Sequence, residues 1–205
     1  MNTVRAFVAI ELPPHILTHL ENLQSRMKQD VPAGLVRWVK SEGIHLTLQF
    51  LGDVPTTQIE AIAAAIQAVC VSYTPFVFHV GGLGCFPNLR RPNVIWVGVD
   101  EPGGILPRLQ RDIEQSLKPL GFKPEDRKFS PHLTLGRIKG GRPAELQALG
   151  EYITHSKVQI GEAQAAAVHL IRSELLPGGA VYTSLAEAPL AAHVGAVGFT
   201  AGKSA

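Results

Sequence analysis

Phe129-Ser-Pro-His-Leu-Thr-Leu-Gly-Arg137 contains a four-residue pattern that occurs twice in this chain of 205 residues. The tetrad His132-Leu-Thr-Leu repeats His45-Leu-Thr-Leu, which lies 87 residues earlier (132 − 45). Because leucine is common in proteins but histidine and threonine are not, two such tetrads have a chance probability on the order of 10⁻⁵. The repeat therefore predicts two related halves, each of which contributes one histidine strand to a shared site.

Both tetrads lie in runs of residues that are typical of β-strands. Alternate residues of a strand face the same side, so the histidine and the threonine of each tetrad share one face, and the two leucines share the other. We expect the leucine face to be buried in the core. The opposite faces, which carry His45 with Thr47 and His132 with Thr134, can then present two imidazoles and two hydroxyls to one ligand. This arrangement favours acid–base chemistry on an oxyanion.

The composition excludes several classes of protein. Hydrophobic residues make up 45% of the chain and charged residues 18%, as in ordinary globular proteins. A net charge of +2 does not predict the many phosphate contacts of a strongly basic nucleic-acid-binding protein. Two cysteines form neither a disulfide framework nor a zinc site. The N-terminus lacks a signal-peptide pattern, and no apolar run reaches about 18 residues. We expect a soluble, cytoplasmic protein.

The order of apolar patterns predicts an α+β fold with mainly antiparallel sheets. The predicted strands are residues 4–10, 36–39, 44–51, 75–80, 94–99, 130–138, 157–160, 166–174 and 180–186. The predicted helices are a first one that ends near residue 29, then residues 56–71, 105–120 and 143–152. Residues 81–92, which are rich in glycine, proline and arginine, are predicted to form a loop. We expect residues 1–187 to form one domain and residues 188–205 to be a poorly ordered tail.

Several stretches besides the tetrads resemble one known family. They are residues 5–13, 37–39, 86–98, 129–137 and 173–182, and the likeness extends over about residues 4–187. Together they resemble the two-histidine phosphoesterase superfamily, and within it the RNA 2′,3′-cyclic phosphodiesterases, once named 2′-5′ RNA ligases. The resemblance implies a bilobal fold, in which two pseudo-symmetric antiparallel-sheet lobes with flanking helices surround a central cleft.

The resemblance also implies an activity and roles for named residues. The expected reaction is hydrolysis of a 2′,3′-cyclic phosphate end to a 2′-phosphate, without a metal or another cofactor. Its partner would be RNA with such an end or a cyclic nucleotide, and we expect the protein to be a monomer. In the family pattern His45 donates a proton, His132 accepts one, and Arg137 binds the phosphate.

Elementary chemistry supports such a use of these side chains. A water must lose a proton as it attacks phosphorus, and the leaving sugar oxygen must gain one. With an unperturbed pKa of about 6.5, one histidine can act as base while the other acts as acid. Thr47 and Thr134 can donate hydrogen bonds to the non-bridging oxygens. Strict alternation would place Arg137 on the face opposite Thr134, unless the strand bends or ends at Gly136.

Other interpretations stay open at several positions. The threonines are also good strand formers, and Arg137 could be a solvated strand end. Arg90 and Arg91 could contact RNA or belong to an ordinary exposed turn.

Two aromatic residues and two further histidines have simpler explanations. For Phe7 and Trp38 we favour packing over stacking on a base. His15 and His19 have helical i,i+4 spacing but no accompanying metal-site pattern, so we expect them on a solvated helix face.

Two other functions remain compatible with the sequence. One is a cyclic phosphodiesterase that acts on small nucleotides or ADP-ribose cyclic phosphate. The other is a module that binds RNA ends without turnover, although a binding site for phosphate needs donors and not a matched acid and base.

Overall fold

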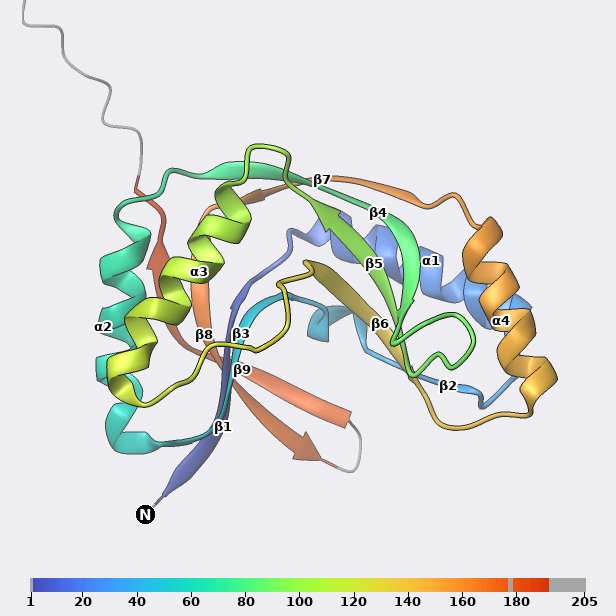
Figure 1. Ribbon diagram of the computed structural model, residues 1–205, viewed down its shortest axis with the longest axis horizontal. Helices are drawn as coiled ribbons and strands as arrows, with labels where there is room; N and C mark the ends of the chain where they lie inside the picture. The colour runs from blue at the N-terminus through green and yellow to red at the C-terminus, as the bar shows by residue number, and fades with distance from the viewer. Residues whose placement is uncertain (1, 177–178, 192–205) are drawn as a thin grey trace, which may run out of the picture.

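The computed structural model describes residues 2–176 and 179–191, whose strands form two antiparallel sheets (Figure 1). The first sheet consists of β3 (Leu46–Pro55), β1 (Thr3–Ile10), β8 (Ala167–Leu176) and β9 (Gly179–Pro189), in this spatial order. The second consists of β2 (Val36–Trp38), β6 (His132–Ile138), β5 (Val94–Asp100), β4 (Phe76–Phe86) and β7 (Gln159–Ala165). The two tetrad strands, β3 and β6, therefore lie in different sheets, and the predicted bilobal α+β fold is confirmed.

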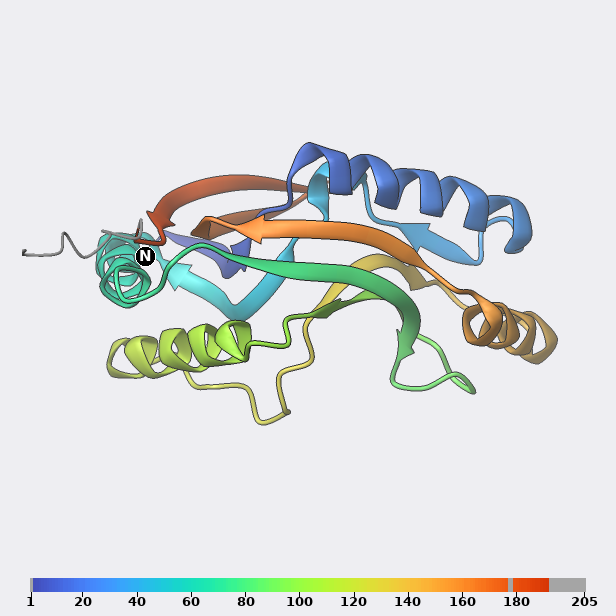
Figure 2. The ribbon, with the colours of Figure 1, turned by 90° about the horizontal axis from the view of Figure 1, so that it is seen from above.

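Each sheet is bordered by two helices (Figures 1 and 2). The helices α2 (Ile59–Cys70) and α3 (Ile105–Leu117) pack on the first sheet, and α1 (Pro14–Asp30) and α4 (Pro143–His155) pack on the second. Short 3₁₀ turns span Ser41–Gly43, Thr56–Gln58 and Lys118–Leu120. No helix in the part of the chain described here is long and apolar enough to cross a membrane.

The helices attach to the sheets through apolar stripes. In α3 the side chains of Leu106, Leu109, Ile113 and Leu117 are all at most 1% exposed, and their spacing of three to four residues places them on one face. Full burial of a leucine or isoleucine contributes about 1.5–3 kcal/mol. The stripe is therefore sufficient to fix α3 against the sheet.

Both sheets draw strands from both halves of the chain. β2, from the first half, pairs with the second tetrad strand β6, while β8 and β9, from the second half, complete the sheet that contains β3. One continuous hydrophobic core includes residues of both sheets, for example Leu46 and Leu133. The two halves are thus interleaved, and neither sheet can form in full from one half.

Residues 81–86 belong to strand β4 and not to the predicted loop of residues 81–92. β4 continues through Gly81-Gly-Leu-Gly-Cys-Phe86, and residues in this stretch pair with β5. A Cβ atom at Gly84 would lie 2.3 Å from the Trp96 ring, so the glycine makes room for an aromatic side chain of the neighbouring strand. Here glycine indicates close packing inside a sheet and not a turn.

The first tetrad strand also has different ends from those expected. It begins at Leu46, one residue after His45, and it continues past Gly52-Asp53 to Pro55. Gly52 has φ 71° and still pairs with Ala6 of β1. Its left-handed conformation favours glycine, and it coincides with a register shift between β1 and β3, so the glycine accompanies an irregularity and does not end the strand.

The boundary of the expected tail is wrong for its first residues. β9 extends to Pro189, and Leu190 is buried. The Leu190 N–H donates to the Ala166 carbonyl at 2.9 Å, and the Ala191 N–H donates to the Tyr73 carbonyl at 2.7 Å. These contacts attach residues 188–191 to the fold, because their backbone groups find partners in distant segments. Residues 192–205 lie outside the described part of the chain.

Candidate active site

The two tetrads occupy equivalent places in their sheets. His45 immediately precedes β3, and His132 is the first residue of β6. The four tetrad leucines, Leu46, Leu48, Leu133 and Leu135, are at most 3% exposed. Both histidines and both threonines are half-buried. The predicted alternation is therefore confirmed, with the leucines in the core and the histidine–threonine pairs on the other face.

A β-bulge follows both threonines. In the first sheet Thr47 pairs with Ala9 and Gln49 with Val8, so that Leu48 is the extra residue. In the second, Thr134 pairs with Trp96 and Gly136 with Ile95, so that Leu135 is the extra one. A bulge places two residues opposite one and shifts the alternation of faces.

This bulge decides where Arg137 points. Leu135 and Gly136 are both buried, and Arg137, next in the chain, is exposed although β6 continues to Ile138. The shift returns Arg137 to the face of Thr134, which strict alternation does not allow. β6 does not end at Gly136. The bulge by itself is enough to change the face on which Arg137 lies.

His45 lies among aromatic side chains of the first sheet. Its ring stacks on Phe7 of β1 with a centroid distance of 4.4 Å and meets the edge of Tyr182 of β9 at 5.1 Å. Burial lowers the pKa of His45 to about 4, and a hydrogen bond with the Gly43 backbone opposes this change only in part. Without a ligand, the His45 imidazole is therefore neutral at pH 7.

His132 has a comparable aromatic setting in the second sheet. Its ring meets Phe86 of β4 edge-on at 4.9 Å and lies 6.3 Å from the Trp96 ring of β5. His132 Nδ1 lies 2.7 Å from the Ser130 carbonyl oxygen. Because a carbonyl oxygen can only accept, Nδ1 carries the hydrogen. In the neutral ring Nε2 is then unprotonated and can accept a proton.

Residues of the second sheet lie close to the surroundings of His45 in the first. β3 and β6 contact each other, although they belong to different sheets. Burial raises the pKa of Tyr182, which touches His45, and the positive charges of Arg137 and Arg5 oppose this change. Arg137, from the second sheet, therefore lies within electrostatic range of the surroundings of His45 in the first. The structure brings together His45, Tyr182 and Arg137 as parts of one site.

Sequence reasoning missed the aromatic residues around the histidines. Tyr182, Phe86 and Trp96 were not candidates, because nothing in their local pattern distinguishes them from core residues. Phe50 did have a signal. It lies five residues after His45, as Arg137 lies five residues after His132. Its side chain is 57% exposed and lies 5.9 Å from the Phe7 ring, next to His45.

The remaining candidates have structural explanations or lie elsewhere. Phe7 is 2% exposed, as expected for a packing residue, and the Trp38 ring lies beneath Lys28 Nζ at 5.9 Å. His15 and His19 are exposed on α1, and their rings bond to backbone carbonyls of β7. Arg90 and Arg91 are exposed in the loop between β4 and β5.

Metal ligands are not grouped in the described residues. In residues 2–176 and 179–191, no three His, Cys, Asp or Glu side chains are placed to hold a metal ion. The candidate side chains of the two tetrads are imidazoles and hydroxyls, and Arg137 adds a guanidinium.

A family model described as LigT like Phosphoesterase matches the chain twice, over residues 10–96 and 97–182. The tetrads begin at the same offset in the two matches, 35 residues after the first matched position (45 − 10 and 132 − 97). The internal repeat inferred from the tetrads thus coincides with two copies of one family unit.

Individual relatives match over most of the chain. A protein of Methanothermobacter thermautotrophicus named RNA 2′,3′-cyclic phosphodiesterase is 36% identical over 183 residues, which are 89% of this chain and 96% of the relative. A protein of the same name from Aquifex aeolicus is 33% identical, over 91% of this chain and 97% of the relative. The crystal structure of TT0787 from Thermus thermophilus superposes with a TM-score of 0.77 at 27% identity, over 92% of this chain and 99% of that one.

Proposed function

The chain belongs to the LigT-like phosphoesterase family, and from this premise we propose that it hydrolyses 2′,3′-cyclic phosphate ends of RNA to 2′-phosphomonoesters. The observation that carries the proposal is the duplicated histidine–threonine tetrad, present once in each of two contacting strands. A site that only bound phosphate would need donors, whereas two imidazoles in equivalent positions offer both a base and an acid.

His132 is the proposed general base. Its Nδ1–H is engaged by the Ser130 carbonyl, which leaves Nε2 to take the proton from the attacking water. The water oxygen forms a bond to phosphorus, and the bond between phosphorus and O3′ breaks. His45 is the proposed general acid, which delivers a proton to the departing O3′. The sum is one water consumed and one 2′-phosphomonoester formed, with no cofactor in the scheme.

The pKa of about 4 for His45 requires that the substrate itself help to protonate the acid. A phosphodiester carries one negative charge. At about 4 Å and an effective dielectric constant of about 20, an opposite charge is worth about 4 kcal/mol, or roughly three pKa units. Binding of the cyclic phosphate therefore favours the His45 imidazolium. The acid becomes charged when there is a leaving group to protonate.

The other side chains of the site hold the substrate in this scheme. Thr47 and Thr134 donate to the non-bridging oxygens, and Arg137 adds charge-assisted hydrogen bonds to the same phosphate. Phe50 is exposed and lies against Phe7, on which the His45 ring stacks, so it provides a planar apolar surface on which the terminal base or ribose can pack.

Hydrolysis of small cyclic nucleotides is the alternative within the same chemistry, and binding of RNA ends without turnover is the alternative outside it. The test is a product-resolved assay in EDTA with a 2′,3′-cyclic mononucleotide, an RNA with a 2′,3′-cyclic end and ADP-ribose cyclic phosphate. We expect 2′-phosphate products, formed fastest from the RNA. Absence of product from all three substrates would leave the binding module as the better explanation.

Three further properties stay predictions. A monomeric state is checked by the mass in solution, and a cytoplasmic location by fractionation of cells. A single catalytic domain, rather than two separable lobes, is supported by the interleaving of both sheets, and one cooperative unfolding transition is the expected result.

A further inference from the structure

A groove separates the loop between β4 and β5, residues 87–93, from helix α4. Its volume of about 660 Å³ is in the range of binding sites for small ligands. None of the tetrad residues lines it, so the groove is distinct from the candidate active site.

The loop that forms one wall is held in place by hydrogen bonds to the Asn88 side chain. Asn88 Oδ1 accepts hydrogen bonds from the backbone N–H groups of Arg90 and Arg91, both at 3.1 Å. The opposite wall approaches so closely that a Cβ atom on Gly150 of α4 would lie 2.8 Å from the Leu89 carbonyl oxygen. The two arginines therefore extend from a fixed backbone, which reduces the entropy lost when they bind a ligand.

The lining combines apolar and basic side chains. Leu89 and Leu146 are apolar, and Arg90 and Arg91 are exposed. Neither arginine forms an ion pair with any carboxylate of residues 2–176 or 179–191. The one lining carboxylate, Glu151, accepts a hydrogen bond from Gln147 Nε2 at 3.0 Å. Apolar surface beside unpaired guanidinium groups suits single-stranded nucleic acid, which offers flat bases and backbone phosphates.

The loop is also connected to the surroundings of His132. It begins next to Phe86, whose ring meets the His132 ring at 4.9 Å. At its other end the Ile138 N–H of β6 donates to the Asn93 carbonyl at 2.9 Å. The groove therefore belongs to the lobe that carries the proposed base, one loop away from it.

We propose that this groove binds the RNA strand that precedes the cyclic phosphate, with Arg90 and Arg91 contacting its backbone phosphates. The inference rests on the proposed function, because it presumes that the 3′ end lies at the histidines. A strand whose end is held there must leave the site in the 5′ direction, and the β4–β5 loop, which begins just after Phe86 beside the His132 ring, offers unpaired positive charge. A cyclic mononucleotide has no preceding strand, and therefore offers no backbone phosphate to the groove.

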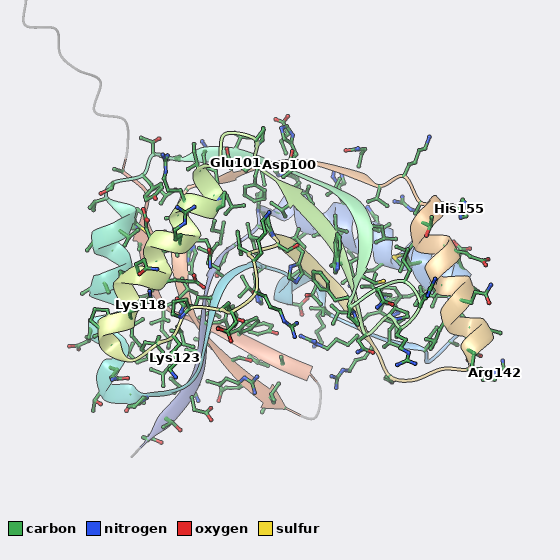
Figure 3. All side chains as sticks on the ribbon, in the orientation of Figure 1. Asp100, Glu101, Lys118, Lys123, Arg142 and His155 are labelled. Atoms are coloured by element: carbon green, nitrogen blue, oxygen red, sulfur yellow. The ribbon has the colours of Figure 1, made fainter. Side chains whose placement is uncertain are left out.

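The experiment compares wild type with the double variant Arg90→Ala/Arg91→Ala. The matched control, Arg111→Ala/Lys118→Ala, removes the same net charge from exposed positions near the other end of the molecule, where Figure 3 places Lys118 opposite His155 of α4. Two quantities are measured for each protein. One is kcat/KM for a 2′,3′-cyclic mononucleotide and for a ten-nucleotide RNA with a 2′,3′-cyclic end. The other is the affinity for fluorescein-labelled RNA of the same sequence, measured by anisotropy at several salt concentrations.

In the groove variant we expect kcat/KM for the RNA and the affinity for labelled RNA to fall about tenfold, with the mononucleotide unchanged. The log–log salt slope of RNA binding should become shallower by about 1.4, the value for two contacts to a single strand. The control should match wild type in every measurement.

Unchanged RNA affinity, or equal losses with RNA and mononucleotide, would overturn the proposal. If wild type turns over neither substrate, the proposed function fails, yet the anisotropy still decides whether the groove binds RNA.

Discussion

The strands β3 and β6 carry the same tetrad and the same bulge at its second leucine, but they differ at the fifth residue after the histidine. In β3 this residue is Phe50, and in β6 it is Arg137, both exposed. The duplicated backbone therefore presents a flat apolar group on one side of the site and a cation on the other. In the proposed mechanism the repeat supplies the acid–base pair, and we propose that the positions just beyond it divide the recognition of base and phosphate between the lobes.

The two imidazoles also differ in their surroundings. His45 lies between Phe7 and Tyr182, and its burial lowers its pKa to about 4. His132 keeps a hydrogen bond from Nδ1 to the Ser130 carbonyl. A symmetrical pair could exchange roles, whereas the desolvation of the His45 ring disfavours its charged form.

Removing either imidazole should have the largest effect. His45→Ala and His132→Ala should each lower kcat for a cyclic mononucleotide by about 10²–10⁴-fold, the usual contribution of a general acid or base. The double variant should be little worse than either single one, because groups that act as a unit are not additive. Steady-state kinetics in EDTA gives the result, with circular dichroism as the control for folding. Near-wild-type turnover in a folded single variant would rule out the mechanism.

The proton affinity of His45 should rise about 10³-fold when a cyclic phosphate binds. Since its pKa of about 4 then approaches neutrality, binding near pH 7 should take up a fraction of a proton that grows as the pH falls toward 6. The measurement is calorimetry of 2′,3′-cyclic AMP binding to the inactive His132→Ala variant, in buffers of different ionisation enthalpy. Absence of uptake between pH 6 and 7 would mean that His45 stays neutral, and would assign it the role of base.

Loss of the cation should weaken catalysis on both substrate lengths. Arg137→Ala should lower kcat/KM by about 10–100-fold, the range for a hydrogen bond to a charged group. Arg137→Lys should recover only part of this, because it keeps the charge but not the forked geometry. Arg142→Ala is the matched control, since it removes one exposed charge of the same lobe at α4 (Figure 3). If Arg137→Ala behaves like this control, Arg137 is a solvated strand end.

Loss of the aromatic surface should have the smallest effect and should depend on the base. Phe50→Ala should lower kcat/KM about tenfold for cyclic AMP, near the lower end of the range for stacking on a base, and less for cyclic UMP. Phe50→Tyr should retain activity, because it keeps the ring. Equal losses for purine and pyrimidine would show that Phe50 does not contact the base.

Much of the site was predictable because its signals are local. The tetrads, their alternation and the burial of Leu46 and Leu133 follow from residues that are close in sequence, since a strand places alternate side chains on opposite faces whatever its partners are. The position of Arg137 was not predictable in this way. Its face depends on a bulge, and a bulge is a property of two paired strands.

The errors in the strand boundaries have the same origin. Gly84 is typical of a loop, yet it lies in β4 because the Trp96 ring of the neighbouring strand occupies the space of its missing side chain. Residues 188–191 have a composition that suggests a tail, yet their backbone groups bond to Ala166 and Tyr73. In both cases the decisive partner is distant in sequence.

The sequence was enough to identify the proposed catalytic pair, the two-fold repeat and the α+β class, because each depends on which residues follow one another at short spacing. The tertiary structure alone decided which strands share a sheet, where Phe50 and Arg137 point, and how strongly burial lowers the pKa of His45. Pairing and burial depend on side chains from both halves of the chain. For that reason the proposed acid and base are recognisable as a pair in the sequence, but the different surroundings of their two rings arise only in the fold.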